Sequence, residues 1–152
     1  MGDEAWETLM PHASCPMPIR IALVAIMGID FGARRIGVAV SATGDLATPH
    51  SVLRNDGDVI AKLATLGDEL EAELFVVGIA RGEQRFRDFA ERLRQKTCKE
   101  VVLWDEALTT VEAAEQLRAA GRKRRDAERE IDMHAAAVIL QSYLDDRARR
   151  AS

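Results

Sequence analysis

Three acidic residues occupy positions where a carboxylate is costly to bury. Asp30 ends an apolar run that begins at Leu23, Glu106 lies just past the apolar run 101–104, and Asp132 starts a helical face that continues through alanines. An unpaired charge in such a place costs several kcal/mol unless a positive partner compensates for it. Converging carboxylates would also raise one another's pKa, and a divalent cation with oxygen ligands relieves that repulsion. The pattern therefore predicts a site for one or two Mg²⁺ or Mn²⁺ ions.

Each of these carboxylates also has a structural explanation when it is taken alone. Asp30 could be a turn or cap residue, Glu106 could interact with the positive end of the next helix, and Asp132 could pair with Arg129. The metal interpretation depends on the whole set, because all three positions lie at element ends that one topology would bring together. Two ions ~3.5–4 Å apart would stabilise the attacking and leaving oxygens of a displacement at phosphorus.

The elements that would position these acids form one α/β domain. Strands are predicted at 21–30, 35–41, 47–53, 74–79 and 101–104, and helices from Asn55 or Asp56 to Ala72, at 84–95, at 109–120 and from 128 to 147. This order predicts a mixed five-stranded sheet that begins with an antiparallel hairpin and carries helices on both faces. Ligands of such sheets gather at the carboxyl ends of the strands. Asp30 and Glu106 fall there.

The ends of the chain are predicted to lie outside this domain. Residues 1–18 show no periodicity and hold three of the four prolines, so we expect an extension outside the fold. This domain is expected to span residues 19–148, and residues 149–152 are expected to form a tail.

Composition excludes some classes of protein. With 152 residues, 47% of them hydrophobic and 30% charged, the chain has the composition of a soluble globular domain. No apolar stretch approaches the length of a membrane span, so no membrane partner is expected. The two cysteines form neither a metal-binding spacing nor a disulfide framework, which fits a reducing cytoplasm.

Basic residues gather in two places although the net charge is −4. Arg34 and Arg35 lie at the predicted hairpin turn, and a second cluster precedes the last helix. That cluster is Arg122, Lys123, Arg124 and Arg125. Beside a metal site, both groups would bind phosphates, with an affinity that falls steeply with salt. The alternatives are a solvated charge run for the cluster and pairing with surface acids for Arg34 and Arg35.

Three further residues are candidates for supporting roles. Gly32 would allow a close backbone approach or a positive φ just after Asp30. Thr109 is expected to be a helix N-cap near the site, as the first residue of a capping box. His134 projects to a different helix face from Asp132, so we expect a structural role, with proton transfer as the alternative.

Four segments of the sequence resemble the YqgF/RuvX family of RNase H-like Holliday junction resolvases, also described as pre-16S rRNA nucleases. They are IDFGARRIGVAVS, VVGI, DEALTTVEA and IDMHAAAVILQSYL, in order between Ile29 and Leu144. The resemblance implies an RNase H-like fold in which Asp30, Glu106 and Asp132 match the family's acidic metal-binding triad. It also implies metal-dependent hydrolysis of phosphodiester bonds in branched DNA or precursor ribosomal RNA.

The sequence departs from the family pattern at two places and leaves rival functions open. Ala80 and a shorter loop stand where the family has proline and a longer loop, and Ala107 stands where arginine is usual. A non-catalytic nucleic-acid-binding or regulatory protein of the same fold is therefore one alternative. An actin-like nucleotide-binding ATPase is another, but it would need two such lobes and leaves Glu106 and Asp132 unexplained. The chain is expected to act as a monomer or a homodimer.

Overall fold

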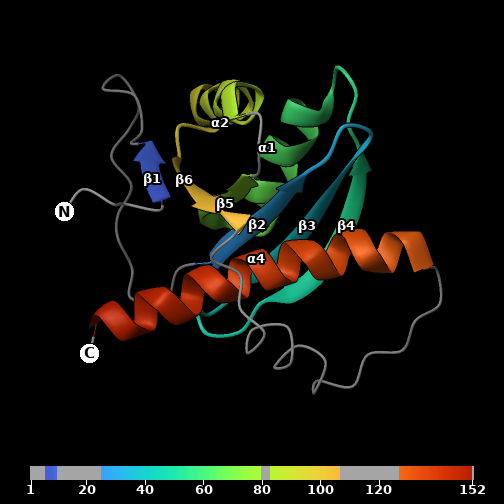
Figure 1. The fold of residues 1–152 in the computed structure, drawn as a ribbon. Helices are drawn as coiled ribbons and strands as arrows, with labels where there is room; N and C mark the ends of the chain where they lie inside the picture. The colour runs from blue at the N-terminus through green and yellow to red at the C-terminus, as the bar shows by residue number, and fades with distance from the viewer. Residues whose placement is uncertain (1–5, 10–24, 80–82, 107–126, 152) are drawn as a thin grey trace.

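One mixed sheet forms the centre of the molecule, and helices cover both of its faces (Figure 1). The computed structural model describes residues 6–9, 25–79, 83–106 and 127–151. In chain order, the elements are β1 (Trp6–Leu9), β2 (Ala25–Phe31), β3 (Arg35–Ser41), β4 (Thr48–Arg54), α1 (Val59–Glu69), β5 (Ala72–Ile79), α2 (Glu83–Thr97), β6 (Glu100–Asp105) and α4 (Ala127–Ala151). The predicted helix 109–120 lies outside the described residues.

The strands follow the order β1-β6-β5-β2-β3-β4 across the sheet. Strands β2, β5 and β6 run parallel to one another, whereas β3 is antiparallel to β2 and β4 is antiparallel to β3. This arrangement confirms the predicted hairpin and the mixed five-stranded sheet. Because β2, β5 and β6 are parallel, their carboxyl ends meet at one edge of the sheet, here called the carboxyl edge.

The two faces of the sheet carry separate apolar cores. Helices α1 and α2 cover one face, where Phe75, Leu63 and Leu93 are fully buried. Helix α4 covers the other face, where Ala136, Leu140 and Trp104 belong to the second core. Figure 1 shows α4, and no other described helix, crossing the sheet on that side. We call these the α1/α2 face and the α4 face.

Residues 6–9 differ from the prediction that residues 1–18 lie outside the fold. They form β1, which pairs antiparallel with β6 from Trp6 opposite Trp104 to Leu9 opposite Val101. The described sheet therefore has a sixth strand. The physical reason is that β6 would otherwise be an edge strand with unpaired backbone groups, which an extended segment can satisfy. The other residues of 1–18 lie outside the described residues.

The predicted tail and the predicted cap of the first helix were also wrong. Helix α4 continues to Ala151, and Arg150 Nε donates to Asp146 Oδ2 at 2.7 Å, an i,i+4 pair that supports the last turns. Helix α1 begins at Val59 with Asp58 at its N-cap. Asn55 instead donates a side-chain hydrogen bond to the hairpin turn, which explains why it does not cap the helix.

The expectation of no disulfide was wrong as well, because Cys98 is disulfide-bonded. Cys98 follows helix α2 with a φ of 57°, a conformation that normally favours glycine at a helix end. The chain's other cysteine, Cys15, lies outside the described residues. Cys98 has no other cysteine near it in the sequence, so no spacing pattern indicated its bond. No helix in the described ranges is long and apolar enough to cross a membrane.

Candidate active site

Asp30 lies at the carboxyl edge with a glycine on each neighbouring strand. In the sheet register it stands opposite Gly37 of β3 and opposite Gly78 of β5. Neither neighbour has a side chain, so no side chain of β3 or β5 lies directly beside the half-buried carboxylate, and Ile139 of α4 packs over Gly78. Side chains alternate between faces, and Gly28, two residues earlier, abuts helix α4. Asp30 therefore belongs to the α4 face.

Glu106 reaches the same place from β6. It follows Trp104 by two residues, and Trp104 belongs to the core of the α4 face. Its carboxyl group makes a side-chain hydrogen bond with Asp30. Gly78 stands between the two strands, opposite both Asp30 and Trp104, so no side chain of β5 separates the acids. The structure thus brings two of the three predicted carboxylates together.

The electrostatics of this pair favour a proton or a cation. Partial burial is the main cause that raises the pKa of Glu106, and the neighbouring charge of Asp105 raises it further. The hydrogen bond with Asp30 acts in the opposite direction and lowers the pKa. Because burial and repulsion prevail, the pair holds a proton more readily than an ordinary glutamate does, and a bound cation would remove that tendency.

The third predicted acid, Asp132, lies in helix α4, and only its backbone is described. It precedes Ala136 by about one helical turn. Helix α4 approaches the sheet closely there: a Cβ added at Gly28 would lie 3.1 Å from the Ala136 carbonyl oxygen and 2.6 Å from Leu140 Cβ. Among the described side chains, no three metal-ligating residues come together. The place of Asp132 in the triad stays a prediction.

The hairpin turn after Asp30 is held tightly, as predicted for Gly32. The Gly32 N–H donates to the Arg35 carbonyl at 3.1 Å, and a Cβ at residue 32 would lie 2.5 Å from that oxygen. A close backbone approach, and not a positive φ, is thus what requires glycine. Asn55 ties the turn to the end of β4, with Nδ2 donating to the Gly32 carbonyl at 2.7 Å. No pattern in the sequence indicated this role of Asn55.

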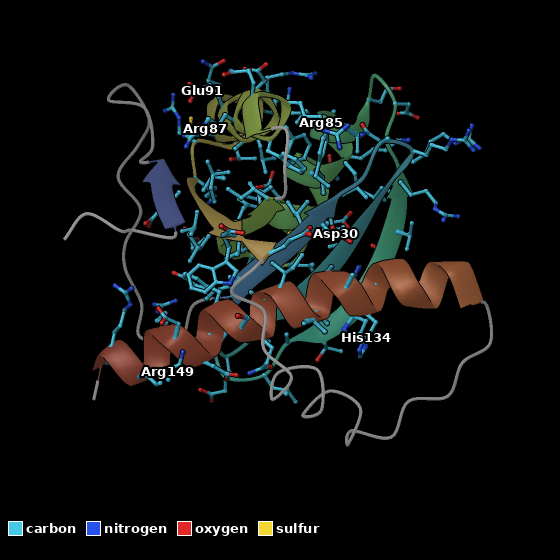
Figure 2. All side chains as sticks on the ribbon, in the orientation of Figure 1. Asp30, Arg85, Arg87, Glu91, His134 and Arg149 are labelled. Atoms are coloured by element: carbon cyan, nitrogen blue, oxygen red, sulfur yellow. The ribbon has the colours of Figure 1, made fainter. Side chains whose placement is uncertain are left out.

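The remaining predicted site residues divide into three groups. Arg34 and Arg35 are exposed at the hairpin turn. Figure 2 shows His134 on the opposite side of helix α4 from Asp30, so the structure does not bring His134 to the carboxylate pair. The others lie outside the described residues: Thr109, Arg122, Lys123, Arg124 and Arg125.

An aromatic cluster beside the site was not predicted. The Phe31 ring lies 4.5 Å from that of Phe89 and 5.4 Å from that of Phe86, centroid to centroid. The Arg85 guanidinium lies over this cluster, 5.8 Å from the centroid of Phe31. The sequence indicated Phe86 and Phe89 as core residues, which is confirmed. The contact across to Phe31 depends on how α2 packs, so no local pattern could reveal it.

Comparison with known proteins identifies relatives across most of the chain. Residues 24–146 match the RuvX family, described as Holliday junction resolvase. A candidate pre-16S rRNA nuclease of Mycobacterium tuberculosis H37Rv is 43% identical over 133 residues, covering 80% of this chain and 78% of the relative. Relatives of the same name from Nitratidesulfovibrio vulgaris and Protochlamydia amoebophila are 37% and 36% identical, covering 78% and 87% of this chain and 92% and 97% of theirs.

Solved structures of RuvC from Thermus thermophilus have the same fold. The complex with a Holliday junction substrate superposes with a TM-score of 0.62 at 15% identity, covering 85% of this chain and 97% of that one. A second RuvC structure gives a TM-score of 0.57 at 14% identity, covering 83% and 97%. At these identities the likeness concerns the fold, and it confirms the predicted RNase H-like architecture. The sequence match over residues 24–146 and the relatives at 36–43% identity show that the chain belongs to the RuvX family.

Proposed function

We propose that the protein is a divalent-metal-dependent nuclease that hydrolyses phosphodiester bonds in structured nucleic acid. The observation that carries the proposal is the contact between the Asp30 and Glu106 carboxyl groups at the carboxyl edge. The relatives' names support precursor 16S ribosomal RNA as the substrate, whereas the family description and the RuvC complex support a four-way DNA junction. Both substrates are branched or folded polyanions.

The residues at the edge fit a hard divalent cation such as Mg²⁺ or Mn²⁺. Asp30 and Glu106 provide oxygen donors whose mutual repulsion a cation would relieve, and Asp132 is the proposed third ligand. When bound, one or two such ions would stabilise the charge that develops on the phosphate oxygens during displacement. The protein's own part is to hold the donors in place, because Asp30 is fixed by hydrogen-bonded strands on both sides.

Basic residues would hold the substrate while the acids act. Arg34 and Arg35 are exposed directly after Asp30, on a turn stiffened by Gly32 and Asn55. The cluster 122–125 is proposed to bind phosphates on the side of the helix that carries Asp132. We propose no base-specific contact, because phosphate contacts position a nucleic acid without reading its sequence.

The test is cleavage of a labelled four-way DNA junction and of a precursor 16S rRNA fragment, with Mn²⁺, Mg²⁺ or EDTA. We expect metal-dependent cutting that falls by at least about 10³-fold in Asp30→Asn and in Glu106→Gln, because each loses a charged donor. Asp58→Asn is the matched control, since Asp58 is an exposed acid at the start of α1. Binding of both substrates without cutting by the wild type would overturn the nuclease proposal and favour the non-catalytic alternative.

We propose that the protein works in the cytoplasm, as a monomer or a homodimer. A disulfide at Cys98 is uncommon in that compartment. The state of Cys98 in protein trapped by alkylation directly from cells tests the location, and a disulfide retained there would contradict it.

A further inference from the structure

Arg85 is exposed, and its guanidinium group stacks on two packed aromatic rings. Its guanidinium carbon lies 5.1 Å from the ring centroid of Phe86 and 5.8 Å from that of Phe31. Phe86 is buried, and Phe31 is packed against Phe86 and Phe89. Stacking on two rings limits the rotamers of a long side chain, so less entropy is lost when the guanidinium binds a further partner. Because Phe31 directly follows Asp30 on β2, this cation lies near the same edge of the sheet as the carboxylate pair but on the opposite face.

A second cationic group lies around the hairpin turn. Arg35 of β3 stands directly opposite Arg54 of β4 in the sheet register, and both are exposed. Like charges placed directly opposite on neighbouring strands destabilise a sheet. Arg34 belongs to the same corner, because its carbonyl accepts a hydrogen bond at 2.8 Å from the N–H of Asn55, the residue after Arg54.

The acid nearest to this corner along the chain is engaged mainly by residues of the α1 segment. This acid is Asp56, whose carboxylate accepts hydrogen bonds from the Asp58 N–H at 2.9 Å and from Lys62 Nζ at 3.4 Å. Within the described parts of the chain, neither Arg34 nor Arg85 forms an ion pair with an acidic side chain. Repulsion among exposed arginines lowers the stability of the fold. Arginines kept in such a cluster near an acidic site indicate a polyanionic ligand that contacts both the arginines and the acidic site.

Figure 2 shows where Arg85 lies on its helix. It is on the side of α2 that faces the β2–β3 hairpin, whereas Arg87 and Glu91 lie on the other side. Asp30 belongs to the α4 face, and Arg85 belongs to the helix layer of the α1/α2 face. A ligand that touches both must pass over the carboxyl edge of the sheet.

We infer that Arg54 and Arg85 bind phosphates of the substrate backbone, which crosses the carboxyl edge from the Asp30–Glu106 pair to helix α2. The inference rests on the proposed function, and it joins Arg54, which the register places on the α4 face, to Arg85 on the face opposite to α4. The ligand chemistry is the sugar-phosphate backbone, whether of a DNA junction or of a folded RNA.

The experiment measures the salt dependence of binding for a labelled four-way DNA junction with duplex arms. Fluorescence anisotropy titrations at 50 to 200 mM salt, in EDTA to prevent metal-dependent cutting, would compare the wild type with Arg85→Ala and Arg54→Ala. Each lost phosphate contact should make the slope of log K against log salt less steep by about 0.9. Over this fourfold change in salt, the wild type should therefore lose about 3.5-fold more affinity than either variant.

Arg92→Ala is the matched control. Arg92 is also exposed and lies seven residues after Arg85, on the same side of α2 but about 10 Å further from the carboxyl edge. Arg92→Ala should bind the junction with the same slope of log K against log salt as the wild type. Arg85→Lys keeps the positive charge, so the slope of log K against log salt should stay close to that of the wild type. If Arg85 and Arg54 had purely structural roles, the slope would be unchanged in every variant. Thermal melts of each variant would check that the fold is intact.

Two outcomes separate this inference from the nuclease proposal. If Arg85→Ala and Arg54→Ala bind the junction and the precursor rRNA fragment with the same affinity and slope as Arg92→Ala, the inference is overturned, even if the wild type cuts. If the slopes change as expected but the wild type cuts neither substrate with any metal, the crossing path stands and the nuclease proposal fails.

Discussion

The two faces of the sheet are built in different ways. On the α1/α2 face, large side chains such as Phe75, Leu63 and Leu93 fill the space between the strands and two helices. On the α4 face, glycines let the single helix come close to the strands. A Cβ at Gly28 would lie 2.6 Å from Leu140 Cβ, and one at Gly78 would lie 2.5 Å from Ile139 Cδ1.

This difference indicates a division between stability and positioning. A core of large interdigitated side chains contributes much apolar burial, and it can adjust to small changes by moving side chains. A contact between bare backbone and a helix adjusts poorly, so it fixes the distance between the two elements. The fixed distance matters on the α4 face, because Asp30, Glu106 and the helix that carries Asp132 meet at its edge.

The largest loss of stability is expected on the α1/α2 face. Leu93→Ala removes a fully buried side chain and should lower the free energy of unfolding by about 2–5 kcal/mol. Urea denaturation would measure this loss. The rate of nucleic-acid cleavage per folded molecule should be unchanged, because Leu93 lies far from the carboxyl edge along α2. A loss of cutting larger than the loss of folded protein would contradict the division between the faces.

A smaller loss of stability with a larger loss of function is expected for Gly28→Ala. The new methyl group must displace helix α4, because the atoms it meets are Leu140 Cβ and the Ala136 carbonyl oxygen. Overpacking of this kind costs about 1–3 kcal/mol. Cutting should fall by more than tenfold at a metal concentration that saturates the wild type, since the helix carrying Asp132 moves.

Gly57→Ala is the control for this substitution. An added Cβ at Gly57 meets nothing within 4 Å, so stability should change by less than about 1 kcal/mol and cutting should not change. If Gly28→Ala cuts as well as Gly57→Ala, close approach of α4 is not what positions the site.

The smallest effect concerns the pH dependence of stability. The pKa of Glu106 is raised in the folded state, mainly by burial, so the folded protein holds this proton more tightly than the unfolded chain does. Without metal, Glu106 therefore lowers stability as the pH rises through its ordinary pKa of 4.5 toward the raised value, and the full penalty is present above that. Glu106→Gln lacks this penalty.

Thermal melts in EDTA between pH 4 and pH 7 would test this sign. The melting temperature of Glu106→Gln should rise relative to the wild type as the pH increases. Mg²⁺ at pH 7 should stabilise the wild type and not the variant. A wild type that gains stability relative to Glu106→Gln with rising pH would show that Glu106 is not under electrostatic strain.

Much of the fold followed from local patterns. Strand β5 and strand β6 were predicted because short apolar runs bounded by polar residues indicate strands covered on both faces, and they were found at Ala72–Ile79 and Glu100–Asp105. The positions of Asp30 and Glu106 at the carboxyl edge followed from the predicted ends of β2 and β6. Their contact is set by local periodicity together with a simple topology, which is why the sequence could predict it.

Features that depend on distant partners were missed. Strand β1 is four residues long, and its pairing with β6 gives no periodic signal in the sequence. Gln141 reads as a polar residue on the last helix, yet it is buried, and its Oε1 accepts the Ala47 N–H at 2.8 Å. The stacking of Arg85 on Phe31 likewise joins residues from different elements. Only the packed structure specifies such pairs.

The intrinsic fluorescence of Trp104 reports on the packing of helix α4. Its indole is buried between β6 and α4, where Nε1–H donates to Ser142 Oγ at 3.3 Å and the ring meets Tyr143 edge-on at 5.4 Å. Indole emission shifts to longer wavelength when the ring is exposed to water, so a change in the packing of α4 would shift the emission maximum of Trp104. In a Trp6→Phe background, where Trp104 is the single tryptophan, metal binding at the nearby acids could be followed by fluorescence without any added label.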